Sequence, residues 1–484
     1  MLRTNAPPRL FVGERLRRLR EQHRISQAAL ARSIGLSPSY LSQIECDQRP
    51  LPRRILHRLA ERLGVSVSAF EDSETLRLVH DLREATADPL FGGTIVSLAE
   101  AEASIQAAPV VAERFLTLYR AFRARGEQVA PAGRDIPLVV SSSYEEVRDW
   151  VQSHRNHFAG LDRAAEELVE REGFSRNALQ EDLTRTLRDR HGIAVESRAA
   201  LLEQGTVWKL NRATRTLALA EEATIESRVF WMAHAVAQLE QRREIERVLR
   251  RAPLSTPEAT ALARVGLANY FAGALMMPYA RFLQEARAVR YDVARLQQRF
   301  GASFEQVCHR LSTMQRPSMP GLPFFFLKTD IAGNVLKRSS ATRFQFARFG
   351  GPCPLWNVYG AFARPGETLV QLARTPDDVT YLNIARTVGR SDSAYLSRPR
   401  SVAVVLGCEI EYAPLTVYAA GLDLGSPAAA VPIGPGCRAC ERLGCRHRAV
   451  PPAGRALDVG SGERGVVPYR ILPDLNQGSR NEQI

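Results

Sequence analysis

The chain has 484 residues, of which 45% are hydrophobic and 24% charged, so its composition is that of a globular protein with room for about three domains. A formal net charge of +13 favours a polyanionic partner such as nucleic acid. No stretch of about 20 apolar residues could cross a bilayer, and no signal peptide precedes the first motif. Seven cysteines, an odd number, argue against a disulfide framework and for a reducing compartment. We therefore expect a cytoplasmic protein with no membrane partner.

Residues 9–62 have the pattern of a helix-turn-helix module. Ser26 is suited to cap one helix, and Gly35 is suited to end it in a left-handed turn that needs no Cβ. Ser37 is suited to cap the next helix, in which Pro38 takes the first position, where a missing N–H costs nothing. The segment carries twelve arginines against five acidic residues, a net charge of +7 that suits a phosphate backbone.

The second of these helices is predicted to be a recognition helix that enters the major groove. Leu36, Leu41 and Ile44 recur at helical spacing and are expected to pack on the preceding helices, which leaves polar side chains on the other faces. The side chains predicted to contact a double-stranded DNA operator are Gln27, Ser37, Ser39, Tyr40, Ser42, Gln43 and Arg49. Because such modules usually read two half-sites, we expect a homodimer or a higher homo-oligomer.

The chain is predicted to be helical up to about residue 175 and mixed beyond it. Apolar residues at helical spacing predict the first helices, at 53–63, 75–84, 109–125, 144–158 and 161–172. Strands are predicted next, at 192–196, 206–210 and 215–219. One long helix is predicted at 225–249, then one at 257–277 and two shorter ones before residue 312. The last strands are predicted at 324–327 and 402–406, and the Gly/Arg-rich tail after 451 is expected to be disordered.

The predicted long helix contains the remnant of a zinc-peptidase motif. A zinc peptidase of this kind carries His-Glu-x-x-His on a helix, with two ligands one turn apart and a general base between them. Here His234 is followed by Ala235 in place of the glutamate and by Gln238 in place of the second histidine. Without the base, and with a single imidazole, hydrolysis by this route is not credible. We therefore expect no enzyme activity and interpret His234 as a core residue.

Three cysteines lie within nine residues near the C-terminus, in a loop flanked by proline and glycine. Cys437, Cys440 and Cys445 are spaced so that the loop could wrap around one metal centre, and the arginines among them would offset the charge of an iron–sulfur cluster. Either Cys353 or His447 could supply the fourth ligand. Four thiolates suit a [4Fe–4S] cluster or zinc, three with the histidine favour zinc, and a purely structural role for the thiols stays open.

The order of these segments resembles the short-chain fatty acyl transcriptional regulators. That family joins a helix-turn-helix of the xenobiotic-response-element type to a degenerate IrrE/ImmA-like peptidase domain and a cysteine-bearing C-terminal domain. The resemblance covers residues 9 to about 450. Three segments carry it beside the helix-turn-helix: LANYFAGALMMP at 267–278, GGPCPLW at 350–356 and CRACERLGC at 437–445. Within the family, the chain resembles the actinobacterial type that regulates propionate and glyoxylate metabolism.

The resemblance implies a short-chain acyl-coenzyme A effector bound by the middle domain. The phosphates of CoA need Arg or Lys, and its adenine needs an aromatic ring. We name Arg188, Arg190 and Tyr270 as candidates for these contacts, the alternative being a solvated basic face and a core tyrosine. The resemblance also favours a [4Fe–4S] cluster over zinc, because the family carries a cysteine in the same Gly-Gly-Pro-Cys-Pro context. The predicted metal ligands are then Cys353, Cys437, Cys440 and Cys445.

The predicted fold class is mostly α with α+β parts, in five segments. These are a helix-turn-helix domain (1–75), a helical connector that is a dimer surface or a plain spacer (76–160), a degenerate zinc-peptidase-like α+β domain with the acyl-CoA site (161–320), a C-terminal α/β sensor domain with the cysteine cluster (321–450) and a disordered tail (451–484). The predicted function is a DNA-binding transcriptional regulator that responds to short-chain acyl-CoA and controls propionate or acetate metabolism, through the methylcitrate or glyoxylate route. The alternatives are a redox or iron sensor that uses the cluster alone and, less favoured, an IrrE-type metallopeptidase.

Overall fold

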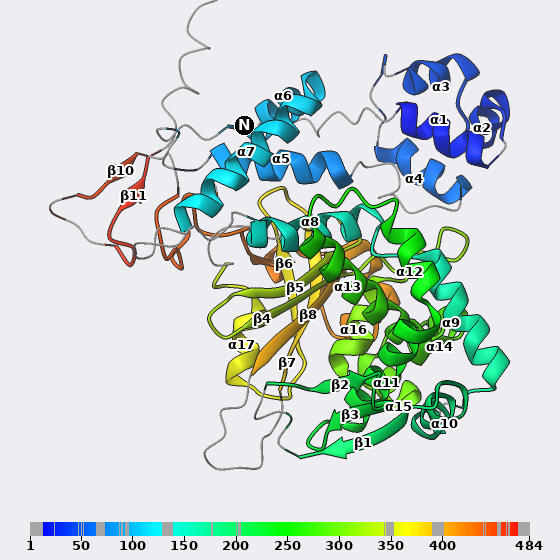
Figure 1. The fold of residues 1–484 in the computed structure, drawn as a ribbon. Helices are drawn as coiled ribbons and strands as arrows, with labels where there is room; N and C mark the ends of the chain where they lie inside the picture. Colours follow the sequence, from blue (N-terminus) through cyan, green and yellow to red (C-terminus); the bar gives the residue numbers. More distant parts are fainter. Residues whose placement is uncertain are drawn as a thin grey trace, which may run out of the picture. The chain divides into compact units, whose positions relative to one another are not determined.

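The computed structural model describes residues 13–23, 25–46, 48–49, 51, 53–63, 73–86, 88, 91, 96–127, 139–175, 178–199, 201, 205–342, 344, 353–389, 401–438, 440, 442–452, 456–460, 462 and 465–472. The chain divides into two compact units, Met1–Val79 and His80–Ile484. Each unit is described by itself below. Figure 1 labels the helices and strands.

The first unit is built from four short helices around a small apolar core. The helices are α1 (Gly13–Gln22), α2 (Gln27–Ser33), α3 (Pro38–Glu45) and α4 (Arg53–Leu63). The predicted caps are confirmed, because the hydroxyl of Ser26 accepts from the Ala29 N–H and that of Ser37 from the Tyr40 N–H. Gly35 has the predicted left-handed conformation, with φ of +70°. Among the described residues, the fully buried core side chains of this unit are Leu16, Leu30, Ala31, Leu41, Ile44 and Leu59.

Five helices connect this module to the mixed part of the chain. They are α5 (Ser73–Thr86), α6 (Leu98–Ala107), α7 (Pro109–Glu127), α8 (Val139–Ser153) and α9 (Ala159–Glu172). A capping box starts α6, in which Ser97 and Glu100 bond to each other's backbone N–H groups. Most of the linker expected between α7 and α8 lies outside the described residues.

A small three-stranded sheet follows α10 (Leu179–His191). Its strands are β1 (Ala194–Arg198), β2 (Trp208–Asn211) and β3 (Thr216–Ala220), in the order β1-β3-β2. The strands predicted at 206–210 and 215–219 are present and form a hairpin, since β2 and β3 pair antiparallel from Trp208 with Leu219 to Asn211 with Thr216. Strand β1 lies parallel to β3 on the other side.

The prediction of a single helix at 225–249 is wrong, because the helix is interrupted at Gln241. Two helices result, α11 (Ile225–Glu240) and α12 (Arg242–Leu249), and the backbone of Gln241 leaves the helical region at φ −99° and ψ 11°. The break redirects α12 so that Ile245 and Leu249 are buried, although its other residues are mostly charged. Four more helices follow, three of them short where two were predicted: α13 (Pro257–Met276), α14 (Tyr279–Ala288), α15 (Val293–Phe300) and α16 (Phe304–Ser312).

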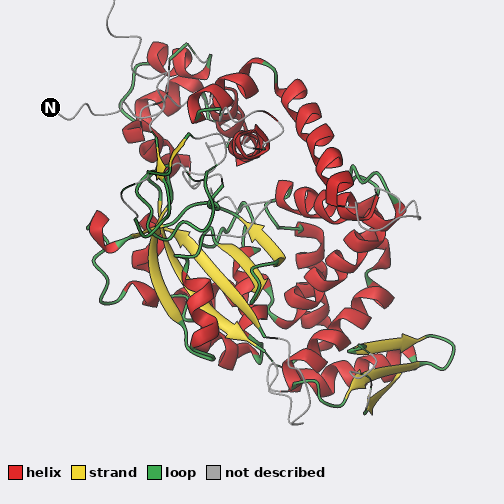
Figure 2. Ribbon diagram, turned by 90° about the vertical axis from the view of Figure 1, so that its left-hand side faces the viewer, coloured by secondary structure: helices red, strands yellow, loops and turns green. Residues whose placement is uncertain are grey.

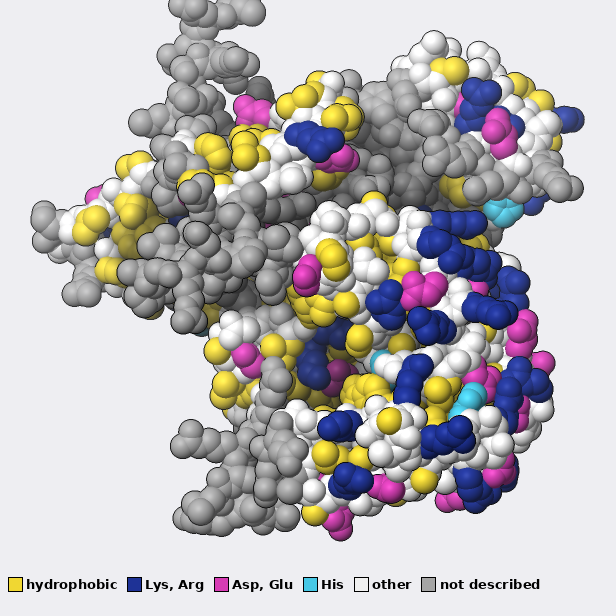
Figure 3. Space-filling view, viewed as in Figure 1, with side chains coloured by type: hydrophobic (Ala, Val, Ile, Leu, Met, Phe, Trp, Pro, Cys, Tyr) yellow, Lys and Arg dark blue, Asp and Glu magenta, His cyan; other side chains and the backbone are white. Residues whose placement is uncertain are grey.

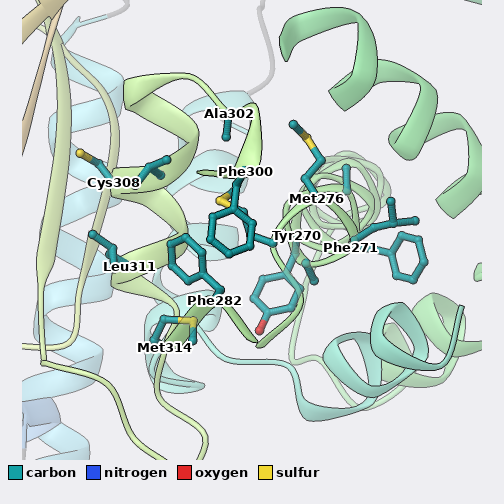
Figure 4. Close-up of a cluster of buried hydrophobic side chains, with 14 of the residues drawn as sticks. Tyr270, Phe271, Met276, Phe282, Phe300, Ala302, Cys308, Leu311 and Met314 are labelled. Carbon is teal, nitrogen blue, oxygen red and sulfur yellow. The ribbon is translucent and has the colours of Figure 1, made fainter. Parts of the chain in front are cut away.

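These helices meet in the largest apolar core of the described chain. Figure 4 shows Tyr270 of α13, Phe282 of α14 and Phe300 of α15 close together, while Phe271 of α13 points away from them. The rings of Phe282 and Phe300 lie edge to face with centroids 5.1 Å apart. The same core extends onto one face of the large sheet through Phe326 and Leu406, so helices and sheet share it.

A six-stranded sheet forms the C-terminal part, with helices packed beside it (Figure 2). The strand order is β5-β4-β8-β7-β6-β9, and all pairs are antiparallel except β6 with β9. The strands are β4 (Phe325–Asp330), β5 (Val335–Ser340), β6 (Leu369–Arg374), β7 (Thr380–Val388), β8 (Val402–Glu409) and β9 (Val431–Pro432). The helix α17 (Asn357–Ala363) packs against strands β6, β7 and β8. Strands β5, β6 and β7 and helix α17 were not predicted from the sequence.

The tail after residue 451 was expected to be disordered, and that expectation is wrong for part of it. Two short strands, β10 (Leu457–Asp458) and β11 (Arg470–Ile471), pair antiparallel there. Residues 473–484 lie outside the described part of the chain.

Candidate functional site

Helix α3 presents a polar face and buries an apolar one, as a recognition helix requires. Leu41 and Ile44 are fully buried against the other helices, whereas Ser39 is exposed and Ser42 and Gln43 are half-buried. The side chain of Ser37 is used as the cap, so its role here is to start the helix. The exposed side of α3 is therefore the surface that this module offers to a major groove.

Tyr40 and Arg49 lie together beside this surface. The guanidinium carbon of Arg49 lies 5.4 Å from the centre of the Tyr40 ring, within the range of a cation–π contact. Arg49 is exposed and Tyr40 half-buried. The contact holds a cation at the end of the recognition helix, where a phosphate group would pass.

A buried carboxylate ties the helices of the module together. Glu45, which is 7% exposed, accepts two bonds from the guanidinium of Arg20, at 2.7 and 3.0 Å, and one from the amide of Gln27, at 2.9 Å. The bond to Glu45 raises the pKa of Arg20. Gln27, predicted to contact DNA, thus has its amide nitrogen on Glu45. Neither Arg20 nor Glu45 was singled out from the sequence, because no local spacing links residues 25 positions apart.

The side chains of the degenerate zinc motif on α11 are packed in the protein core. His234 is fully buried between Trp208 and Trp231, with ring centroids 4.9 and 5.5 Å away. Its Nε2 lies 3.0 Å from the amide nitrogen of Gln238, the residue at the position of the second ligand. Burial lowers the pKa of His234 to about 4, so the imidazole is neutral at pH 7. The interpretation of His234 as a core residue agrees with this placement.

The three candidates for CoA contacts are not brought together. Arg188 is 66% exposed and bonds the neighbouring Asp189 at 2.7 Å, whereas Arg190 pairs with Glu172 at the end of α9. Tyr270 is 6% exposed and reaches Asp162 at the start of α9. Ten residues separate the two ends of α9, about 15 Å along the helix axis. In this arrangement the ring of Tyr270 is not open to a ligand.

Tyr270 instead belongs to a buried polar network that joins α9, α13 and α16. Asp162 accepts bonds from Arg310 at 2.7 Å and from the Tyr270 hydroxyl at 2.9 Å, and the His157 ring lies 3.0 Å away. Arg310 also donates to the carbonyl of Met277 at 3.0 Å. Burial alone would raise the pKa of Asp162, but Arg310 and His157 lower it to about 2. The carboxylate is therefore charged and paired, and it fixes how the three helices pack.

The four cysteines predicted as metal ligands line one small hollow. Cys353 comes from the segment before α17 and the others from the loop after β9. The hollow is lined by Cys353, Pro354, Pro432, Gly434, Gly436, Cys437, Cys440, Arg442, Cys445, His447 and Arg448. Both alternatives for the fourth ligand, Cys353 and His447, are thus present. As they stand, no three histidine, cysteine or acidic side chains of the described residues are arranged to hold a metal ion.

Backbone groups and a buried arginine shape this hollow. The N–H of Ala449 donates to the Cys437 sulfur at 3.4 Å. Burial raises the pKa of the Cys353 thiol, while bonds from the backbone of Gly434 and Leu355 act in the opposite direction. A Cβ on Gly434 would lie 2.7 Å from the Cys440 sulfur, so only glycine fits there. Cys437 thus accepts a backbone N–H bond and Cys440 lies against the backbone of Gly434, and both contacts are of the kind found around thiolate ligands.

Arg448 holds the loop around the hollow. It is 7% exposed, and its guanidinium donates to the carbonyls of Cys437 at 2.6 Å, Cys440 at 3.1 Å and Arg442 at 2.6 Å. From the sequence, the nearby arginines were interpreted only as sources of positive charge. In the structure Arg448 also holds the conformation of the loop, because a planar guanidinium can bond three carbonyls only if the loop curls around it.

Three known families match successive parts of the chain. Residues 12–72 match a helix-turn-helix domain, residues 188–312 an IrrE N-terminal-like domain, and residues 313–469 the C-terminal domain described as short-chain fatty acyl coenzyme A regulator. Among the described residues, no helix combines the length and apolar character that crossing a membrane would need.

Several full-length relatives are similar to this chain. It is 42% identical to the propionyl-CoA carboxylase regulator of Cereibacter sphaeroides, over 96% of this chain and 99% of the relative. It is 42% identical to the HTH-type transcriptional regulator RamB and 38% identical to PrpR, both of Mycobacterium tuberculosis, over at least 95% of each chain. A solved structure of a Mycobacterium tuberculosis transcriptional regulator superposes with a TM-score of 0.64 and 40% identity, covering 68% of this chain and 99% of that one.

Proposed function

The chain belongs to the short-chain fatty acyl coenzyme A regulators, a family with helix-turn-helix transcriptional regulators among its members, and we propose that it binds operator DNA in response to a short-chain acyl-CoA. The observation that supports the DNA part most strongly is helix α3. It is capped at Ser37, buries Leu41 and Ile44, and leaves Ser39 exposed beside Tyr40 and Arg49. A small module with one polar helix face and an excess of arginine is better suited to the major groove of DNA than to binding a small-molecule substrate.

The proposed effector is propionyl-CoA or a closely related short-chain acyl-CoA. Two observations support it: the C-terminal match to acyl coenzyme A regulators and the name of the Cereibacter relative, which refers to propionyl-CoA carboxylase. The IrrE-like domain is the proposed binding part, since it keeps the fold of a peptidase without the motif of one. Arg188 and Arg190 are the proposed phosphate contacts. To bind phosphate, Arg188 would leave its ion pair with Asp189, and Arg190 its ion pair with Glu172. Tyr270, held by Asp162, is assigned a packing role.

The proposed cofactor is a [4Fe–4S] cluster, with zinc as the alternative, held by Cys353, Cys437, Cys440 and Cys445. The support is that Cys353, more than 80 residues before the other three in the sequence, lines the same hollow as they do. When bound, the cluster would supply a redox-sensitive group to the sensor part. The chain's own residues would supply the N–H bond to Cys437 and the curled loop around Arg448.

One set of measurements tests these proposals. The protein is purified without oxygen, and iron, sulfide and zinc are counted while the absorbance near 400 nm is recorded. Calorimetry with propionyl-CoA and with free CoA then tests the effector. Binding of propionyl-CoA supports an acyl-CoA sensor. Iron without acyl-CoA binding would favour the second candidate, a cluster-only sensor, which the shared hollow of the four thiols makes reasonable. One zinc and no iron would overturn the cluster, and neither metal nor acyl-CoA would overturn both proposals.

A further inference from the structure

A strongly basic surface lies on α12, outside every site described above. Four arginines form it, and we call them the α12 arginines: Arg242, Arg243, Arg250 and Arg251. All four are exposed. Figure 3 shows Lys and Arg side chains gathered over this helix. The opposite side of α12 is apolar, with Ile245 and Leu249 buried, so the helix is anchored by one face and presents cations on the other.

Acidic neighbours offset the charge of the α12 arginines only in part. Glu244 pairs with Arg247, and Glu246 bonds Arg264 of α13 at 2.7 Å. The two carboxylates of α12 are therefore already engaged. No ion pair with any of the α12 arginines is formed among the described residues of the chain. Glu246 also attracts Arg242 and Arg250 electrostatically, but two carboxylates among six arginines leave the surface with a net positive charge.

The helix dipole favours Arg250 and Arg251, at the C-terminal end of α12, but it does not explain Arg242 and Arg243. Arg242 and Arg243 occupy the first turn of α12, where the helix dipole disfavours cations. Arg243 and Arg247 lie four residues apart, and Arg247 and Arg250 three apart, so like charges are neighbours on the helix surface. Each such placement is unfavourable for the helix. A bound polyanion would offset this repulsion.

We propose that the α12 arginines bind the phosphate backbone of DNA, as a second contact in addition to the recognition helix. The inference rests on the proposed DNA-binding function and names a further surface for it. The two pairs of cations, at the start of α12 and just after its end, lie about 12 Å apart along the helix axis, since eight residues rise by 1.5 Å each. Each pair can thus reach a different phosphate. The contact carries no base specificity and adds affinity to any sequence.

The test compares two quadruple variants of the full chain. In the first, each α12 arginine becomes Gln. In the matched control, four exposed arginines that already pair with a neighbouring acid become Gln: Arg185, Arg198, Arg295 and Arg364. Both variants lose the same charge. The probe is a mixed-sequence DNA duplex several helical turns long, and its affinity is measured by fluorescence anisotropy over a range of salt concentrations.

The α12 variant is expected to bind the duplex at least 10-fold more weakly than the wild type at low salt. Its plot of log affinity against log salt should be shallower by about 2 to 4, since removal of each phosphate contact takes about 0.9 from the slope. The control should change the slope by less than about 1. Equal slopes in the two variants would overturn the α12 contact. Failure of the wild-type chain to bind any duplex would instead overturn the proposed DNA-binding function.

Discussion

Arg448 shows how one side chain can organise a candidate metal site. Its guanidinium bonds three carbonyls of the cysteine loop, and the loop carries three of the four thiols. Removing it should leave these carbonyls without a partner and let the loop open, at a cost of about 2 kcal/mol for buried charged hydrogen bonds.

We therefore predict that Arg448→Ala makes the thiols of metal-free protein react faster with an alkylating reagent, most of all Cys440, which is 8% exposed. Arg446→Ala is the matched control, because Arg446 is exposed and lies two residues away. Mass spectrometry of the alkylated peptides over time gives the rates. Equal rates in the two variants would show that Arg448 does not hold the loop.

The buried carboxylate of Asp162 gives a prediction about stability and pH. Its pKa is lowered to about 2 from 3.8, so its pairing stabilises the fold above about pH 4 and is lost as the pH falls toward 2. Asp162→Asn leaves Arg310 buried without its counter-charge and should cost about 3–5 kcal/mol at pH 7.

Urea unfolding measured between pH 7 and pH 3 checks this prediction. The difference in unfolding free energy between wild type and variant should shrink as the pH falls below about 4. Glu167→Gln, on the exposed side of the same helix, is the control and should differ little from wild type at any pH. A difference for Asp162→Asn that stays constant with pH would contradict the assigned pairing.

At the scale of elements, α3 carries the prediction about specificity. Changing both Tyr40 and Gln43 to Ala should weaken binding to the operator by about 1–3 kcal/mol for each good base interaction that is removed, and should leave binding to unrelated DNA almost unchanged. Arg49→Ala is the contrasting variant. It should weaken binding to all sequences alike and lower the salt slope by about 1. A competition titration with operator and unrelated duplexes separates the two effects. Unchanged specificity in the double variant would refute the assigned face.

The elements that the sequence predicts well are those with local signals. Ser26, Gly35 and Ser37 mark helix ends through their own backbone bonds and angles, and the structure confirms them. The break at Gln241 has no such signal, since no Gly or Pro stands there and only the packing of Ile245 and Leu249 redirects the chain.

The large sheet was mostly missed for a different physical reason. Successive residues of β7, which was not predicted, belong to opposite cores: Leu382 and Ile384 pack toward the helices, whereas Tyr381 and Ala385 pack toward α17. A strand buried on both faces shows no alternation of polar and apolar residues, so its period cannot be read from the sequence.

At the scale of the whole molecule, the features that the sequence does not reveal are contacts between residues far apart in the chain. From the residues alone, Cys353 was one of two candidates to join a loop more than 80 residues later, and the family resemblance favoured it over His447; both segments do line one hollow. The pairing of Asp162 with Arg310 joins residues 148 apart and had no signal at all. Tyr270 was therefore predicted to contact CoA, whereas its hydroxyl donates a hydrogen bond to Asp162 of that pair.

The central claim is that one chain couples acyl-CoA binding to DNA binding. If propionyl-CoA binds one conformation of the protein better than another, it must change operator affinity by the same coupling factor, typically about 5–150-fold. The most direct measurement is the affinity of the full-length, anaerobically purified protein for its own promoter DNA, titrated with propionyl-CoA and, in parallel, with free CoA. We predict a shift of at least about 5-fold with propionyl-CoA and none with free CoA. An operator affinity that stays the same at saturating propionyl-CoA would contradict the coupling.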